Sequence, residues 1–140
     1  MQVLNVPAKD DQLDRVTAFA DEFLEALDCP LKTQMQIDLS IEEIFVNIAH
    51  YAYAGKEGDA EIRIAEADGV VTFTFIDSGV PYDPLKKPDP DISLSAEDRQ
   101  IGGLGIFLVK KNMDSVSYRY EDGKNVLTVT KKIPGLALSD

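Results

Sequence analysis

The chain has few of the residues on which disulfide frameworks and zinc sites depend. Cys29 is its one cysteine and His50 its one histidine. A lone cysteine rules out an internal disulfide and suits a reducing compartment, and a lone histidine nearly excludes a Cys/His zinc site. These two residues could act as nucleophile and base only if the fold joined them. We therefore expect Cys29 to be a buried structural thiol.

Basic residues and long apolar runs are also scarce. Lys and Arg number 14 against 25 Asp and Glu, a net charge of -11, so the surface should repel phosphate backbones. This argues against nucleic acid as a partner and favours a basic protein surface. No apolar run approaches the roughly 18 residues of a membrane span, and the first ten residues do not resemble a secretory signal. We expect a cytoplasmic protein that is not bound to a membrane.

The 140 residues, 44% of them hydrophobic, fit a single domain spanning 1–140. Weak alternation of apolar and polar residues over 2–6, ending at Pro7, predicts a short edge strand. Apolar residues spaced every three or four positions predict one helix from Asp10 or Asp11 to about Cys29-Pro30 and a second over 31–54. Two hairpins, each with an Asp-Gly turn, are predicted over 61–76 and 115–132. Between them lie about 20 residues with prolines at 81, 84, 88 and 90, then a helical run over 106–113. The pattern predicts a largely antiparallel sheet backed by helices, with one long mobile loop.

The 31–54 helix carries a polar stripe beside its apolar face. Glu43 and Asn47 are four residues apart and therefore point the same way, at the boundary of the core. A carboxylate there can polarise a hydroxyl, and an amide oxygen can hold Mg²⁺ without adding a negative charge. Gln36, Ser40 and His50 share the stripe, whereas Glu42 should lie on the surface. The alternative is that the whole stripe is a solvated helix face.

Asp77-Ser78-Gly79 follows an apolar strand, so Asp77 is presented where that strand ends. An ionised Asp only accepts hydrogen bonds, and it therefore matches the adenine 6-amino group and disfavours the 6-carbonyl of guanine. Gly79 has no side chain and would let the backbone approach a flat ring closely. The alternative is an ordinary turn at the end of a strand.

Gly102-Gly103-Leu104-Gly105 precedes an apolar helical run. Glycines before a helix aim its unpaired N–H groups at an anion such as a phosphate. The segment is neither a Walker A loop nor a dinucleotide-binding fingerprint, because the required residues are missing. A flexible hinge is the alternative. Lys110 and Lys111 could reach phosphates, although the helix surface is their more ordinary location.

Together these segments resemble the three motifs of the GHKL ATPases, the superfamily of gyrase and the histidine kinases. Residues 41–53 are similar to the N box, 77–84 to the adenine-binding G1 box and 102–106 to the G2 box. The ending Asn47-Ile48-Ala49-His50-Tyr51-Ala52-Tyr53 and the Gly-x-Pro-Tyr-Asp-Pro extension look most like the stand-alone bacterial anti-sigma factor serine kinases of the RsbW and SpoIIAB type. The resemblance covers residues 10–132. It implies an α+β two-layer sandwich, the Bergerat fold, with helices on one face of a mixed, mostly antiparallel sheet.

The resemblance also implies a function and roles for particular residues. It implies Mg-ATP binding and phosphorylation of Ser or Thr on an anti-anti-sigma (STAS) partner. A sigma factor is a further expected partner, and the chain is expected to form a homodimer. Glu43 would be the general base and Asn47 the Mg²⁺ ligand. The other assignments are Asp77 and Gly79 for adenine, Gly103, Leu104 and Gly105 for phosphates, and residues 84–101 for an ATP lid.

Two positions depart from the family pattern and leave alternatives open. The usual Gly-Thr-Thr is Gly123-Lys124-Asn125, so Asn125 is the candidate for the contact on the adenine side. Ile101 stands where the lid arginine is usual, which leaves Arg99 as the candidate for the γ-phosphate. The rival function is an ATP-gated binding module with little phosphotransfer. A detached histidine-kinase catalytic domain is a third reading, weakened because no dimerisation helix with a phospho-accepting His accompanies the domain.

Overall fold

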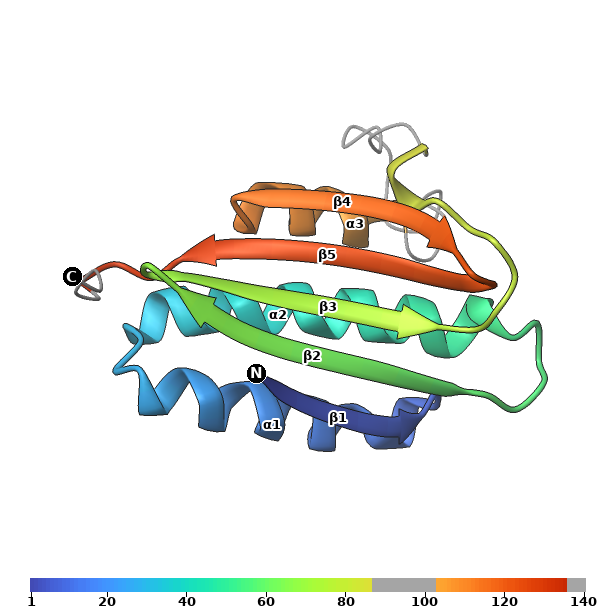
Figure 1. The fold of residues 1–140 in the computed structure, drawn as a ribbon, viewed down its shortest axis with the longest axis horizontal. Coiled ribbons are helices and arrows are strands. Elements are labelled where there is room, and N and C mark those ends of the chain that lie inside the picture. Colours follow the sequence, from blue (N-terminus) through green and yellow to red (C-terminus); the bar gives the residue numbers. More distant parts are fainter. Residues whose placement is uncertain (87–102, 136–140) are drawn as a thin grey trace.

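Five strands form one antiparallel sheet in the computed structural model, which describes residues 1–86 and 103–135. Their order across the sheet is β1-β2-β3-β5-β4 (Figure 1). The strands are β1 (Gln2–Pro7), β2 (Asp59–Ala67), β3 (Val70–Asp77), β4 (Ser115–Glu121) and β5 (Lys124–Lys132). The predicted edge strand and the mostly antiparallel sheet are confirmed. Because β3 pairs with β5, strands from the two hairpins meet at the centre of the sheet.

Both predicted hairpins are confirmed, with their Asp-Gly turns. Asp68 and Gly69 have φ of 52° and 83°, and Asp122 and Gly123 have φ of 53° and 76°. Positive φ at both central residues is the type I′ geometry, whose twist matches that of the strands it joins. The turn residues therefore fix the register within each hairpin.

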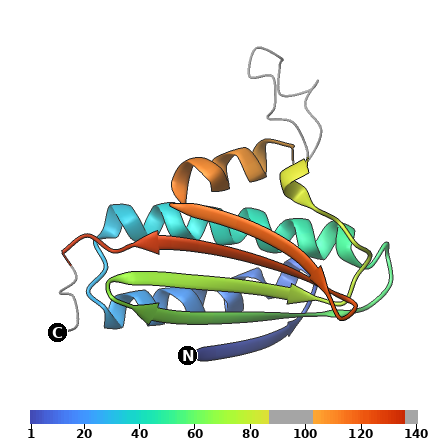
Figure 2. The same cartoon turned by 45° about the horizontal axis from the view of Figure 1, so that its top comes forward.

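Three helices cover one face of the sheet and leave the other face open (Figures 1 and 2). They are α1 (Leu13–Ala26), α2 (Leu31–Asn47) and α3 (Gly103–Asn112), with α2 packed between the other two. Short 3₁₀ turns at Asp10–Gln12 and Pro84–Lys86 complete the described elements. This is the expected α+β arrangement of two layers. None of the helices in the two described ranges combines the length and apolar character needed to cross a bilayer.

The second helix ends earlier than its apolar spacing predicts. The α-helix stops at Asn47 and continues as one π turn, Ile48–Ala52, rather than as regular α-helix to Ala54. At the end of that turn the Ala52 carbonyl accepts a hydrogen bond from the Val80 N–H at 2.8 Å. Periodicity does not predict this change of winding, because the tertiary partner that accompanies it lies 28 residues further along the chain. Single π turns of this kind occur frequently at functional sites.

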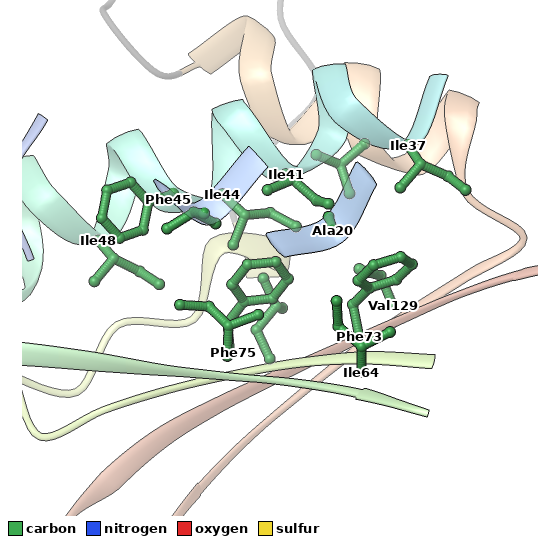
Figure 3. Packing of buried hydrophobic residues seen from close by; sticks show 14 of the residues in the cluster. Ala20, Ile37, Ile41, Ile44, Phe45, Ile48, Ile64, Phe73, Phe75 and Val129 are labelled. Carbon is green, nitrogen blue, oxygen red and sulfur yellow. The ribbon is translucent and has the colours of Figure 1, made fainter. Parts of the chain in front are cut away.

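The core lies between the helices and the inner face of the sheet. Alternate residues of the central strands point inward, including Phe73 and Phe75 of β3 and Val129 of β5, which pack against Ile41 and Ile44 of α2 (Figure 3). Burying each such side chain stabilises the fold by about 1.5–3 kcal/mol. The predicted apolar face of α2 is buried as expected. The same alternation continues to Asp77, which therefore also points toward the helical layer.

Candidate functional site

A buried carboxylate ends the inward-facing row of β3. Asp77 is 6% exposed, and its register partner Asn125 on β5 is 7% exposed. Asp77 Oδ1 accepts hydrogen bonds from Gly79 N and from Asn125 Nδ2, both at 2.9 Å. Neither bond uses Oδ2, to which none of the residues 1–86 and 103–135 donates. Asp77 therefore presents one fixed acceptor oxygen beside the pocket.

The amide of Asn125 is fully engaged inside the protein. Its Nδ2 donates to Asp77 and to Val80 O at 2.8 Å, and its Oδ1 accepts from Tyr82 N at 3.1 Å and from the Tyr118 hydroxyl. These four bonds use the whole hydrogen-bonding capacity of an Asn side chain. Asn125 thus fixes Asp77 and the loop that follows β3, and its contact on the adenine side stays a prediction.

Gly79 packs directly against the π turn. A Cβ built on Gly79 would lie 2.0 Å from the carbonyl oxygen of Ala52. No other residue can occupy this position without moving the backbone of one of the two segments. The structure therefore supplies its own reason for glycine at 79, in addition to the ligand approach expected from sequence.

Tyr53 holds the same loop from the other side. Its hydroxyl accepts the Ser78 N–H at 2.9 Å and donates to the Asp59 carbonyl. Burial raises the pKa of Tyr53, an effect opposed by the hydrogen bond from Ser78. The loop after β3 is thus attached at both Ser78 and Val80 to the end of the π turn that follows α2.

These contacts surround a pocket at the C-terminal end of α2. Its walls are largely apolar and include Ile48, Phe75 and Leu127, with Asp77, Asn125 and Asn47 as polar groups. Aromatic side chains of Tyr51, Tyr82 and Tyr118 also line it, together with Ile44, Ala52, Val80, Pro84 and Ile106. An apolar slot with a few fixed polar atoms suits a flat heteroaromatic ring.

Glu43 and Asn47 approach this pocket differently. Asn47 is one of its lining residues, and Glu43 lies one helical turn earlier, half-buried and outside the lining. Burial, followed by repulsion from Glu42, raises the pKa of Glu43. A raised pKa makes a carboxylate a better proton acceptor. Glu42 is exposed, as predicted.

The predicted phosphate-binding glycines lie at the start of α3. Gly103, Leu104 and Gly105 form its first turn, and Ile106 in the next turn is buried against the pocket. The helix therefore begins beside the pocket, and a helix N-terminus can supply N–H donors to an anion. Arg99 and the greater part of the predicted lid lie outside the described residues. Of that lid, Pro84–Lys86 forms a 3₁₀ turn.

Some polar residues are not brought to this pocket. His50 Nε2 lies 2.7 Å from Asp10 Oδ2 and so connects the π turn to the 3₁₀ turn that precedes α1. Lys111 Nζ lies 4.9 Å from the centre of the Phe107 ring. Cys29 precedes α2 and His50 follows it, so the fold does not pair them.

Sequence reasoning missed Tyr118, which lies outside the three motifs. Tyr118 is the register partner of Leu127, and its hydroxyl donates to Asn125 Oδ1 and accepts the Tyr82 N–H at 3.3 Å. Alternation in β4 signals that Tyr118 and Val116 share the inner face of the sheet. Only the pairing of β5 with β3, which the sequence does not specify, brings that face to Asp77.

Comparison with known proteins places the chain among ATPase domains. The family described as "Histidine kinase-like ATPase domain" matches residues 6–131. The serine/threonine-protein kinase BtrW of Bordetella bronchiseptica is 29% identical over 100 residues, which are 71% of this chain and 70% of the relative. The anti-sigma F factor of Clostridium acetobutylicum is 23% identical over 125 residues, 89% of this chain and 86% of the relative. Kinases and anti-sigma factors thus both resemble this sequence, as the three motifs predicted.

A solved structure shares the fold. The RsbU and RsbW domains of Rv1364c from Mycobacterium tuberculosis match with a TM-score of 0.63 and 18% identity, covering 100% of this chain and 35% of that one. With the family match, this confirms the predicted GHKL-type α+β fold.

Proposed function

Because the chain belongs to the histidine kinase-like ATPase domain family, we propose that it is an ATP-dependent protein serine/threonine kinase and anti-sigma factor. Its substrate would be a Ser or Thr hydroxyl on an anti-anti-sigma (STAS) partner, and a sigma factor would be its second partner. The protein would act in the cytoplasm. The observation that carries the proposal is the buried Asp77 carboxylate in an apolar pocket at the ends of α2 and α3.

The pocket fits an adenine ring in shape and in polarity. Asp77 Oδ2 is a hydrogen-bond acceptor held in place by the two bonds to Oδ1. A 6-amino group can donate to it, whereas a 6-carbonyl would face a second acceptor. The walls that include Ile48 and Phe75 offer apolar contact to both faces of a ring. These features favour adenine over guanine nucleotides.

The polar end of α2 supports phosphate transfer. Asn47 would hold Mg²⁺ through its amide oxygen, and the ion, when bound, offsets phosphate charge. Glu43, with its raised pKa, would accept the proton of the attacking hydroxyl. The first turn of α3, Gly103 to Gly105, would donate N–H groups to phosphate oxygens. A pure binding module would need no base one turn from the metal ligand.

Phosphotransfer to STAS proteins tests the proposal. The chain is incubated with Mg-ATP and candidate STAS partners, and incorporation of phosphate is compared between wild type and Glu43→Gln. Loss of the proton acceptor should slow transfer by about 10²- to 10⁴-fold while ATP binding is kept. Glu42→Gln, at the exposed neighbour, is the matched control. It keeps the proton acceptor and removes only the smaller cause of the raised Glu43 pKa, so it should slow transfer far less than Glu43→Gln.

Two results would redirect the proposal. If wild type and Glu43→Gln both fail to transfer phosphate while ATP changes the affinity for the partner, the protein is an ATP-gated binding module. If neither binds ATP, the nucleotide assignment itself is wrong.

A further inference from the structure

A second pocket lies at the opposite end of α2 from the first. It is formed where α2 begins and where β5 ends, two places that lie at the same end of the molecule in Figure 1. We call it the basic pocket, lined by Lys32, Thr33, Gln36, Asp114, Lys131, Lys132 and Pro134. None of these residues contributes to the nucleotide pocket.

The charge of the basic pocket is opposite to that of the whole protein. Three of the 14 basic residues of a chain with net charge -11 line it. Asp114 is its one acidic residue, and it is already engaged: Oδ2 accepts the Lys132 N–H at 2.6 Å, and Oδ1 lies 4.0 Å from Lys131 Nζ. Within the described part of the chain, the ammonium groups of Lys32 and Lys132 form no ion pair.

The start of α2 adds unpaired hydrogen-bond donors. Its N-cap is Pro30, which provides no side-chain hydrogen bond to the helix. The N–H groups of Lys32 and Thr33 therefore lack the partner that a Ser, Thr or Asp cap would supply, and the Leu31 N–H has no acceptor among the described residues. Gln34 is the first residue to bond back, to the Pro30 carbonyl at 2.9 Å. Positive charge and unpaired donors thus coincide at this end of the helix.

Thr33 points to a ligand independently of the helix end. The residue is only 6% exposed and lines the pocket, yet no described residue pairs with its hydroxyl. Asp38 Oδ1 is the only fully enclosed side-chain polar atom that lacks a partner in the described residues. The Thr33 Oγ1 atom therefore remains reachable from the pocket. A buried hydroxyl normally has a hydrogen-bond partner, and here it is free to donate to a group within the pocket.

We propose that the basic pocket binds a phosphate dianion, either inorganic phosphate or a phosphate monoester. The hydroxyl of Thr33 and the N–H groups of the first turn would donate to its oxygens, and Lys32 and Lys132 would balance its charge. A tetrahedral ion with several acceptor oxygens uses this many donors better than a single carboxylate does. This site is independent of the proposed kinase function.

The proposal is tested by following the backbone amides of the full chain by NMR. Inorganic phosphate and O-phosphoserine are titrated separately at constant ionic strength, with acetate as a carboxylate control. We expect saturable shifts of the Leu31, Lys32 and Thr33 amides with phosphate, with O-phosphoserine, or with both, and none with acetate. The ligand that binds more tightly identifies the source of the phosphate. Amides of Gly103 to Gly105 report separately on phosphate in the nucleotide pocket.

Variants distinguish specific binding in the basic pocket from non-specific electrostatic attraction of phosphate to the protein. Thr33→Val keeps the shape of the side chain and removes the hydroxyl, and it should weaken binding about tenfold, the value of one hydrogen bond to a charged group. Lys32→Gln with Lys132→Gln should weaken it at least as much. Lys124→Gln, at the other end of β5, is the matched control and should leave binding unchanged. Equal affinity in Thr33→Val and wild type, equal loss in Lys124→Gln, or equal shifts with acetate would each overturn the proposal.

Discussion

The pockets at the two ends of α2 differ in whether their polar groups are already hydrogen-bonded within the protein. At its C-terminal end the polar groups of Asp77, Asn125 and Tyr53 bond to one another and to backbone, so the pocket is fixed before a ligand arrives. At its N-terminal end the cap is a proline, and the Thr33 hydroxyl has no partner among residues 1–86 and 103–135. The pocket at Asp77, whose polar groups are hydrogen-bonded within the protein, would select a ligand by shape and by the one acceptor that remains, Asp77 Oδ2. The basic pocket, whose donors have no partner among the described residues, would select a ligand by its negative charge.

The largest effect is expected from Asp77→Asn at the paired end. The Asn125 amide should keep an oxygen at the Oδ1 position, so the new NH₂ would replace Oδ2 and face the adenine amine with a donor. Sites that lose a specific hydrogen bond in this way discriminate by roughly 10⁴-fold, and ATP affinity should fall by about that factor. Calorimetry checks it, with Asp83→Asn as the control. Wild-type affinity in folded Asp77→Asn would remove Asp77 from the site.

A steric change at the same end should cost stability instead. In Gly79→Ala the new methyl group would meet the Ala52 carbonyl at 2.0 Å. Relieving the clash requires separation of the β3 loop from the π turn, with loss of the Val80 hydrogen bond, so we expect at least about 3 kcal/mol less unfolding free energy. Denaturant unfolding measures this. Gly55→Ala is a contrast, since a Cβ there meets no atom within 4 Å and only its φ of 84° opposes it.

A smaller and pH-dependent effect is expected between the two ends. Burial is the main cause that raises the pKa of Asp38 from 3.8 to about 7. A hydrogen bond to Asp21, repulsion from the same carboxylate and repulsion from Glu25 raise this pKa further. The folded protein therefore binds more protons than the unfolded chain between these values, and stability falls as pH rises from about 4 to about 7. Asp38→Asn should remove this fall and gain about 1 kcal/mol at pH 8, because solvent screens a partly exposed group.

Thermal unfolding of wild type and Asp38→Asn from pH 4 to 8 tests whether stability falls as pH rises. Asp28→Asn, at an exposed position between α1 and α2, serves as the control and should leave the slope unchanged. Parallel curves for wild type and Asp38→Asn would contradict the assignment.

The smallest effect should come from Pro30→Ser at the unpaired end. A serine cap contributes about 1 kcal/mol to a helix, and loss of the rigid proline costs about 0.4–1 kcal/mol. The net change in unfolding free energy should stay within about 0.5 kcal/mol. Phosphate binding should nevertheless weaken, because the serine oxygen would occupy an N–H that the ligand needs. Tighter phosphate binding in Pro30→Ser would show that those N–H groups are not used.

Local patterns predicted most of the fold because its determinants are local. Asp-Gly turns specify type I′ hairpins, and apolar periodicity identifies α1 and α2. Asp77 and Asn47 were identified for the same reason, since a strand end and a helix stripe are visible in a few residues. The four bonds of Asn125 and the role of Tyr118 were not visible, because each depends on β3 pairing with β5. The π turn was not visible because its partner, Val80, lies 28 residues further along the chain. The basic pocket was missed because Lys32 and Lys132 lie 100 positions apart.

The pairing of β3 with β5 also has a consequence for the order in which the protein folds. Asp77 and Asn125 are 48 positions apart, and both α3 and β4 lie between them in the sequence. Closing such a long stretch carries an entropic cost that local hairpins do not bear. A nascent or partly unfolded chain can therefore contain both hairpins and still lack the nucleotide pocket. A nucleotide that contacts both strands would bind only the completed fold, and it would slow the separation of the two halves of the sheet.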